Sequence, residues 1–456
     1  MKPYQMRVAI IGTGYVGLTT GVCLAWIGHD VTCLDSDEAK IAVLRSGQSP
    51  FFEPHLAETL PEVELRFSTS YAEAIPGADV VFIAVGTPSR PDGKPDLTYL
   101  SSAAAELGRH LNGDFAVIVN KSTVPIGSGN WVESIVRDAW EAKHGTRAGG
   151  QFAVASNPEF LREGSALHDS LYPDRVVIGA DDERALERMY TLYRPLLEQT
   201  FVPPSFLPRP ERMGAVALIS SDLASAELIK YAANAFLALK ISFINEMGAL
   251  AERVGADIKQ VARGIGLDAR IGPRFLQAGI GWGGSCFGKD TSALMSTAEE
   301  YKLDMPIVRA ARQVNSRQRE VVVEKLQESL KILKGRTVAL LGLAFKPNTD
   351  DIRDAPSLDI AERLMERGAR VRVHDPVAIE VGRRQHPDSA VVWCASVEEA
   401  AQDADALVLV TEWPEYLQLD WTELARHVRH PLVLDGRHFL DPAELRKAGF
   451  QYLFVG

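Results

Sequence analysis

RVAIIGTGYVG, residues 7–17, decides the fold of this chain. The apolar run RVAII predicts a buried strand, and the GxGxxG that follows it opens a predicted helix at 14–27. Its glycines permit a tight turn, close approach of a pyrophosphate and close helix–strand packing. Asp35 ends the second predicted strand, 30–34, where a carboxylate accepts hydrogen bonds from ribose hydroxyls and repels a 2′-phosphate. The stretch therefore predicts a dinucleotide-binding domain that prefers NAD to NADP.

The same alternation of strand-like and helical stretches continues along the chain and returns near its end. Such alternation predicts parallel sheets that are covered on both faces. The second half contains no GxGxxG. The predicted strands of the two halves are 80–85, 116–120, 152–155 and 175–178, and then 337–341, 370–374 and 404–410. We expect an α/β protein with two Rossmann-like parallel-sheet domains joined by a long central helix.

The central helix is predicted at 222–254, which has no proline, no glycine before Gly248, and apolar residues on nearly every face. Such a helix needs cover from more than one side. A homodimer packed along it would supply that cover, and burial between its own flanking domains is the alternative. Four prolines make 202–212 a predicted loop at the first domain boundary, with no assigned role. The expected domains are 1–212 (NAD-binding), 213–325 (helical, with the cysteine loop) and 326–456 (the second Rossmann-like domain).

Composition excludes several classes of protein. The 456 residues carry a net charge of −11, which argues against a sequence-independent nucleic-acid binder. There is neither an apolar run of about 18 residues that would span a membrane nor a signal-peptide pattern at the start. The four cysteines show no CxxC spacing, which argues against a disulfide framework and a zinc site. We expect a cytoplasmic protein without a metal.

A glycine-rich loop surrounds one of the cysteines. Residues 279–288 contain five glycines, which would let the backbone wrap a ligand and point consecutive N–H groups at an anion. Lys289 and a predicted helix N-terminus beside Cys286 should lower the pKa of its thiol, so that it can act as a nucleophile. The other three, Cys23, Cys33 and Cys394, lie in apolar patterns or beside a tryptophan and are expected to be buried.

Three further groups of polar residues are candidates for chemistry. Lys230 and Asn234 lie one turn apart on the predicted helix, where a cation and an amide could stabilise an oxyanion, although a lysine is more often simply solvated. The two carboxylates of NPEFLREG, 157–164, follow a predicted strand and are candidate general bases. Lys346 and Arg353, in FKPNTDDIRD, could clamp a diphosphate or could face solvent.

The order of these motifs resembles that of the UDP-glucose 6-dehydrogenase family, from residue 7 to at least residue 436. The resemblance rests on GTGYVG, KSTVPIG at 121–127, NPEFLREG, ELIKYAANAFLALKISFINE at 227–246, GGSCFGKD at 283–290 and FKPNTDDIRDAPS at 345–357. It implies an NAD-dependent, four-electron oxidation of the C6 alcohol of UDP-glucose to a carboxylate. GDP-mannose or another UDP-sugar is the alternative substrate, and a non-catalytic nucleotide-sugar sensor is a second alternative.

The resemblance also implies roles for individual residues. Cys286 would form a thiohemiacetal and then a thioester, Lys230 and Asn234 would hold the oxyanions, Asp290 would handle protons, and Glu163 or Glu159 would assist hydrolysis. The implied NAD contacts are Gly12, Gly14, Tyr15, Val16, Gly17, Asp35, Lys40, Thr87, Thr123, Glu163, Lys289 and Arg353. The implied UDP-sugar contacts are Phe160, Leu161, Arg162, Glu163, Gly164, Lys230, Asn234, Phe275, Leu276, Gln277, Ala278, Gly279, Gly283 and Lys346.

Arg270 would reach the sugar site of a neighbouring subunit, which implies at least a homodimer. Two features depart from the family pattern. The connection at 202–217 looks longer than usual, and Gly288 stands where many relatives carry a larger residue or a proline.

Overall fold

The computed structural model describes residues 5–88, 90 and 93–456. The chain divides into two compact units, which are described separately. The N-terminal unit comprises Met1–Ala232 and Ser292–Glu300, and the C-terminal unit comprises Ala233–Thr291 and Tyr301–Gly456. Within the described ranges, no helix is long and apolar enough to cross a membrane, and no cluster of side chains could hold a metal ion.

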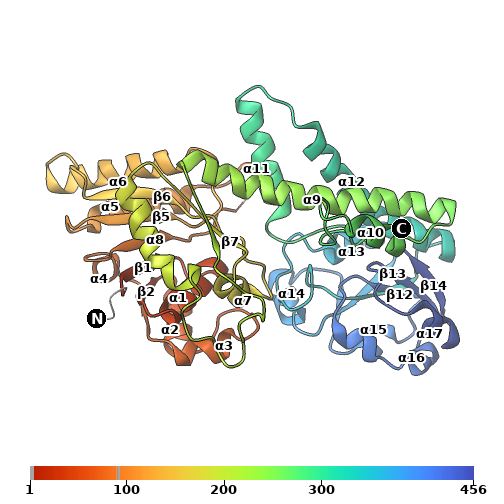
Figure 1. Cartoon of the computed structure of the whole chain (residues 1–456). Coiled ribbons are helices and arrows are strands. Elements are labelled where there is room, and N and C mark those ends of the chain that lie inside the picture. The colour runs from red at the N-terminus through yellow and green to blue at the C-terminus, as the bar shows by residue number, and fades with distance from the viewer. Residues whose placement is uncertain (1–4, 89, 91–92) are drawn as a thin grey trace. The chain divides into compact units, whose positions relative to one another are not determined.

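The N-terminal unit is built on an eight-stranded sheet of order β3-β2-β1-β4-β5-β6-β7-β8 (Figure 1). The first six strands in this order are parallel. β7 pairs antiparallel with β6 and parallel with β8, so the last two strands run against the rest. The bounds are β1 Arg7–Ile11, β2 Asp30–Leu34, β3 Leu65–Ser68, β4 Val80–Ile83, β5 Ala116–Asn120, β6 Phe152–Ser156, β7 Arg175–Ala180 and β8 Ala217–Ser221.

Helices cover both faces of this sheet, as predicted (Figure 1). Alternate residues of β1 show why: Val8 and Ile10 join a core cluster with α8, whereas Ala9 and Ile11 join another with α5 and α6. The helices are α1 Tyr15–Trp26, α2 Glu38–Arg45, α3 Leu56–Thr59, α4 Tyr71–Ala74, α5 Thr98–His110, α6 Ser128–His144, α7 Ala166–Leu171 and α8 Glu183–Leu197, with a 3-10 turn η1 at Leu60–Glu62.

The C-terminal unit holds a six-stranded, all-parallel sheet of order β11-β10-β9-β12-β13-β14. Its strands are β9 Thr337–Leu341, β10 Arg370–His374, β11 Val392–Cys394, β12 Ala406–Leu409, β13 Leu432–Asp435 and β14 Gln451–Phe454. Its helices include α10 Ile258–Gly266, α12 Pro306–Leu330, α13 Pro356–Glu366, α14 Ile379–Gln385, α15 Val397–Ala401, α16 Trp421–His427 and α17 Pro442–Lys447, with η2 at Pro414–Gln418, and α11, Phe287–Glu300, starts in this unit. The predicted fold class is confirmed.

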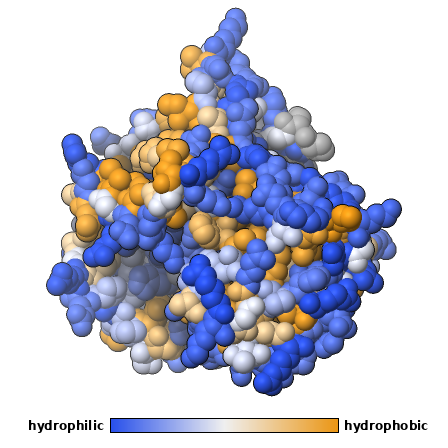
Figure 2. All heavy atoms as spheres, turned by 90° about the vertical axis from the view of Figure 1, so that its right-hand side faces the viewer, coloured by the Kyte–Doolittle hydropathy of each residue, from blue (hydrophilic) through white to orange (hydrophobic). Residues whose placement is uncertain are grey.

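Helix α9, Leu223–Val254, runs through 32 residues without a break, which confirms the predicted long helix. One side of α9 carries large apolar side chains that the chain itself leaves exposed: Leu228, Phe236, Phe243, Leu250 and Val254. We call these five residues the apolar stripe. Figure 2 shows one face of the molecule, on which apolar atoms form several separate patches among polar ones.

Candidate active site

The glycines of residues 12–17 are required by the backbone around them. Gly12 has φ +100°, and a Cβ there would lie 2.6 Å from the Ala84 carbonyl oxygen. A Cβ on Gly17 would lie 1.9 Å from the Gly12 carbonyl oxygen, which is closer than any side chain allows. Gly14 precedes α1 and has open space beside it, so a pyrophosphate has room at the helix N-terminus. The arrangement fits a dinucleotide.

Asp35 lies beside this loop and is held in place by neighbours. Its Oδ2 accepts hydrogen bonds from the Thr13 N–H and hydroxyl, both at 2.8 Å, and from Lys40 Nζ at 3.1 Å. Burial raises the pKa of Asp35, but the hydrogen bonds from Thr13, Asp37 and Lys40 outweigh it and leave the pKa below its usual value. The carboxylate is therefore ionised and fits a ribose diol. Thr13 belongs to the predicted glycine motif, but its hydrogen bonds to Asp35 were not predicted.

Two further candidate NAD residues meet on neighbouring loops, since the Thr87 hydroxyl donates to the Thr123 carbonyl oxygen at 2.9 Å. Lys121, two residues earlier, was not predicted as a site residue. Its ammonium donates to Asn157 Oδ1 at 3.0 Å, and burial lowers the pKa of Lys121 to about 8. The KSTVPIG motif contained this lysine, but its surroundings could not be derived from the motif.

Lys230 and Glu159 form a buried ion pair inside the N-terminal unit. Lys230 Nζ lies 2.9 Å from Glu159 Oε1, and the side chains are only 5% and 7% exposed. Lys230 also lies over the Phe160 ring, 5.4 Å from its centre. The structure thus rules out the solvated alternative for Lys230 and joins two predicted catalytic residues.

The loop after Glu159 carries the other predicted residues of NPEFLREG. Arg162 is exposed and its guanidinium forms two hydrogen bonds to Asp169, of 2.8 and 2.7 Å. Glu163 is half-buried. Gly164 has φ +79°, and its N–H donates to both Glu53 Oε2 and the Tyr15 hydroxyl. Glu53 was missed because it lies 111 residues away in the sequence.

In the C-terminal unit, Asn234 and Asp290 form the second buried pair of predicted catalytic residues. The Asn234 amide donates to Asp290 Oδ2 at 2.6 Å, and Lys289 Nζ lies 3.2 Å from Asp290 Oδ1. Cys286 directly precedes α11, so its thiol lies at a helix N-terminus as predicted. Cys286 is half-buried, whereas the other three cysteines are buried, which confirms their expected burial.

The glycine loop before Cys286 is clamped by the protein. The N–H groups of Gly279, Ile280 and Trp282 donate to Asn245 Oδ1, the Gly436 carbonyl oxygen and Asn315 Oδ1, at 2.8, 2.9 and 2.7 Å. These three groups are therefore not available to an anion, contrary to the expected concavity there. The glycines instead permit close packing: a Cβ on Gly281 would lie 2.3 Å from Asn315 Oδ1.

One helix supplies most of this clamp. Four side chains of α12 donate hydrogen bonds to carbonyl oxygens of the loop. Asn315 and Arg319 both donate to Trp282, Gln318 donates to Gly279, and Arg312 donates to Gly288. None of the four was predicted. The available signal was that Arg312, Asn315 and Arg319 follow one another at intervals of three and four residues, which places them on one side of a helix.

The remaining predicted residues of this unit are placed as follows. Arg353 is exposed and its guanidinium forms hydrogen bonds of 2.6–3.0 Å to Asp351, while Lys346 is half-buried with its ammonium 5.3 Å from the centre of the Phe345 ring. Arg270 points away from the unit's core, with a side chain that is 89% exposed and an ion pair to Asp268. In 275–279, Leu276, Ala278 and Gly279 are buried, Phe275 is half-buried and Gln277 is exposed.

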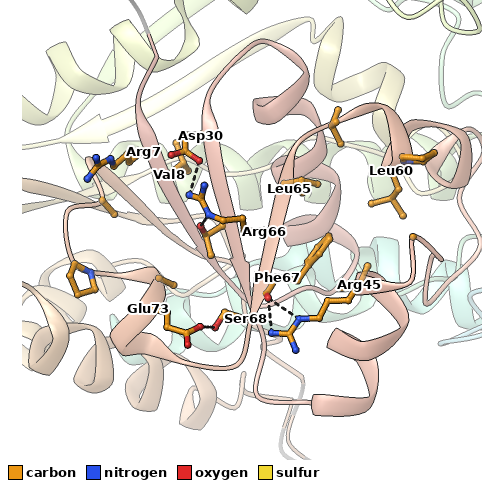
Figure 3. Close-up of a pocket in the computed structure, with 18 residues that line it drawn as sticks. Arg7, Val8, Asp30, Arg45, Leu60, Leu65, Arg66, Phe67, Ser68 and Glu73 are labelled. Atoms are coloured by element: carbon orange, nitrogen blue, oxygen red, sulfur yellow. Dashed lines mark hydrogen bonds and ion pairs between the residues drawn. The ribbon is translucent and has the colours of Figure 1, made fainter. Parts of the chain in front are cut away.

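A cavity of about 760 Å³ also lies in the N-terminal unit, away from these residues (Figure 3). It borders the edge strand β3 and the first residues of β1 and β2, whereas Gly12 and Asp35 follow the last residues of those strands. Two of the three arginines that line it are engaged: Arg66 pairs with Asp30, and Arg45 donates to the Phe67 carbonyl oxygen. The cavity is therefore not the dinucleotide site.

Three consecutive parts of the chain match the domains of one protein family. Residues 6–197 match the NAD binding domain of the UDP-glucose/GDP-mannose dehydrogenase family, 224–317 its central domain and 339–442 its UDP binding domain. The chain belongs to this family. It is 43% identical to a UDP-glucose 6-dehydrogenase of Bacillus subtilis (strain 168) over 99% of this chain and 93% of the relative. With a UDP-glucose 6-dehydrogenase of Rhizobium meliloti (strain 1021) the identity is 45%, over 99% of both chains.

Solved structures of family members agree. The structure of a UDP-glucose dehydrogenase from Pyrobaculum islandicum superposes with a TM-score of 0.86 at 39% identity, covering 100% of this chain and 98% of that chain. A GDP-mannose dehydrogenase from Pseudomonas aeruginosa gives a TM-score of 0.52 at 29% identity, with 99% and 100% covered. The matched NAD binding domain contains the glycine motif and Asp35, so the fingerprint and the family agree on the cofactor.

Proposed function

We propose that this protein oxidises the C6 alcohol of UDP-glucose to the carboxylate of UDP-glucuronate with two NAD. The observation that carries the proposal is the 43–45% identity, along nearly the whole chain, with relatives named UDP-glucose 6-dehydrogenase. GDP-mannose is less favoured as the substrate, because the GDP-mannose dehydrogenase structure from Pseudomonas aeruginosa is less similar in sequence and fold than the UDP-glucose dehydrogenase from Pyrobaculum islandicum.

NAD, when bound, accepts one hydride in each of the two oxidations. The first oxidation removes a hydride and a proton from the C6 alcohol and gives an aldehyde. The Cys286 thiolate then adds to the aldehyde carbon and the oxygen takes up a proton, which gives a thiohemiacetal. Loss of a second hydride and of that proton leaves a thioester, and water cleaves it to the carboxylate and the free thiol. A thiol suits this sequence because its adduct can still lose a hydride.

Cys286 is favoured as the nucleophile by its position. It directly precedes α11, whose first N–H groups carry partial positive charge that favours the thiolate over the thiol. Lys289, in the first turn of the same helix, is paired with Asp290, which offsets its charge. Cys286 also retains accessible surface that the other three cysteines lack.

Each proposed oxyanion-binding residue is paired with a carboxylate. Lys230 contacts Glu159, and Asn234 contacts Asp290. We assign the oxyanions to the ammonium and the amide, because buried donors of this kind stabilise developing negative charge. We assign the proton transfers to the carboxylates, with Glu159 or Glu163 activating the hydrolytic water and Asp290 serving the oxidations.

The NAD contacts proposed are Gly12–Gly17, Asp35, Lys40, Thr87, Thr123, Glu163, Lys289 and Arg353, and the UDP-sugar contacts are 160–164, Lys230, Asn234, 275–279, Gly283 and Lys346. The division into three domains at 212/213 and 325/326 is proposed because the chain belongs to this family. A cytoplasmic location is proposed because Cys286 would stay reduced there.

We further propose a homodimer built on α9. The apolar stripe exposes five large side chains along one side of a single helix, which a second copy would cover. The extended Arg270 side chain is proposed to reach the partner's sugar site.

The proposal is tested by incubating the purified protein with NAD and, separately, UDP-glucose, GDP-mannose and other UDP-sugars. We expect UDP-glucose to be turned over fastest, with two NADH formed per sugar consumed. Faster turnover of GDP-mannose would refute the proposed substrate, one NADH per sugar would refute the four-electron scheme, and binding without turnover would indicate a sensor.

A further inference from the structure

The loop that carries Glu159 and Glu163 is fastened by a residue outside the motifs described above. Glu53 is buried, and its two carboxylate oxygens accept hydrogen bonds from the Gly164 and Ala166 N–H groups, both at 2.6 Å. Ser165 between them does not cap α7 with its side chain. The carboxylate therefore takes the place of a helix cap and fixes both residues of the loop end at once.

The same loop end is tied to the dinucleotide motif. The Gly164 N–H also donates to the Tyr15 hydroxyl at 2.7 Å, and the Tyr15 ring stacks on Phe51, with centroids 4.9 Å apart. Phe51 and Glu53 belong to one short loop, 49–55. This loop thus holds a side chain of the GTGYVG motif and the backbone of the NPEFLREG loop together.

The proline-rich segment, 201–213, packs against loop 49–55. Its Phe206 stacks on His55 with centroids 5.4 Å apart and lies edge-on to Trp26. His55 has a positive φ of 66°, a strained conformation for a residue other than glycine, so its position needs support from neighbours.

The segment is itself anchored to the N-terminal unit. The Val202 carbonyl oxygen accepts from Trp26 Nε1 and the Leu207 carbonyl oxygen accepts from the Tyr172 hydroxyl, both at 2.8 Å. Phe201 belongs to a core cluster with residues of α1, α2, α3 and α7, and Leu207 packs against it. A segment that lacks regular structure is thus held at several points.

We propose that Glu53 is a positioning residue for the sugar-binding loop, and that the proline-rich segment 201–213 serves to hold the loop that carries Glu53. The proposal rests on the proposed function for its effect on turnover, but the hydrogen bonds themselves do not depend on it. It gives a role to a segment for which the sequence alone assigned none.

The test compares Glu53→Gln with the wild-type protein by amide hydrogen exchange and by steady-state kinetics. Glutamine has the same size but offers one acceptor oxygen instead of two, and its NH₂ group would face an N–H donor. We expect exchange at Gly164 and Ala166 to accelerate at least tenfold. We expect KM for UDP-glucose to rise about tenfold and the Kd for NAD to rise less, because only Tyr15 and Glu163 among the proposed NAD contacts adjoin this loop end. Glu53→Asp should be intermediate in both, because its shorter side chain cannot reach both N–H groups, and it replaces the first variant if that fails to fold.

Phe206→Ala tests the segment, with Val202→Ala as the matched control because the Val202 side chain is 80% exposed in the same segment. Phe206→Ala should change exchange and KM in the same direction by about threefold, and Val202→Ala should change neither. Unchanged exchange and KM in Glu53→Gln would overturn the role of Glu53, as would equal losses in KM and NAD affinity. A Phe206→Ala variant that matches Val202→Ala would overturn the role of the segment. If the wild-type protein did not oxidise UDP-glucose, the proposed function would fail, while exchange would still decide the role of Glu53.

Discussion

Replacing Lys230 with Met tests whether the ion pair with Glu159 is as buried as the structure shows. Both side chains are less than a tenth exposed and their charged atoms lie 2.9 Å apart. Removing one partner of such a pair leaves the other charge buried, which costs about 3–5 kcal/mol where nothing compensates it; here the Lys121 ammonium still interacts with Glu159, so we expect the lower end of this range. Glu159 Oε2 has no hydrogen-bond partner among the residues that the structure describes, so no other donor to that oxygen offsets the loss.

The second change, Glu159→Gln, separates the charge from the lost packing. The double variant has no buried charge at either position, but Lys121 loses the carboxylate with which it interacts, so we expect the double variant to be more stable than Lys230→Met by about 1 kcal/mol. Urea unfolding at pH 7.5 gives the free energy of unfolding of the wild-type protein, Lys230→Met and the double variant. Lys143→Met is the control, because Lys143 is an exposed residue of α6 whose loss should cost less than about 0.5 kcal/mol. Equal stability of the single and the double variant at pH 7.5 would refute a buried charged pair.

Four further results are expected. Cys286→Ser should lower turnover at least a thousandfold while NAD affinity, measured by titration, stays within twofold; full activity would exclude the thioester scheme. The pKa of Lys121 is about 8 in the folded protein and 10.5 in the unfolded chain. Between these two pH values the unfolded chain binds more protons, so the free energy of unfolding rises with pH, by at most about 1.4 kcal/mol per pH unit. Lys121→Met should remove this rise when the free energy of unfolding is measured with urea at several pH values. The same pH dependence in the wild-type protein and the variant would contradict the assigned pKa. Gly281→Ala adds a clash to a strained φ of +89° and should destabilise by several kcal/mol and lower kcat, whereas Gly255→Ala, with φ +73° and open space, should cost about 1 kcal/mol in the same melting experiment. Phe243→Asp should shift the protein to monomers in sedimentation velocity, and an unchanged dimer would rule out the apolar stripe as its interface.

Elements with a strong local signal were predicted from the sequence. The strand at 7–11, the long helix and the strands at 337–341 and 370–374 have the predicted bounds to within a residue. The reversed direction of β7 was not predicted. The 18 residues between β6 and β7 contain only the six-residue helix α7, and a connection of that length can join either parallel or antiparallel strands.

The partners of the site residues could not be predicted, because they come from distant parts of the chain. Glu159 and Lys230 are 71 residues apart, and Asn234 and Asp290 are 56 apart. Composition identifies such residues as needing partners when buried but does not identify the partners.

The glycine loop shows a different limit. Five glycines in ten residues indicate that something approaches the backbone closely, but not whether this is a ligand or the protein. A Cβ on Gly283 would lie 2.3 Å from the Asp354 carbonyl oxygen, and one on Gly284 would lie 2.6 Å from the Phe345 ring. The protein itself fills this space, so these glycines are explained by packing without reference to a ligand.

Each of the two buried pairs takes one of its members from helix α9. Each pair lies within one unit, Lys230 with Glu159 and Asn234 with Asp290, so each forms independently of the other, while Glu159 Oε2 keeps no hydrogen-bond partner among the described residues. Lys230 and Asn234 are four residues apart on one helix without a proline, which corresponds to about 6 Å of rise and about 40° of rotation along the backbone. The two side chains therefore leave α9 on nearly the same side, as the sequence predicted, and the spacing of a cation and an amide along one helix was the signal that identified both as candidates before their carboxylate partners were known.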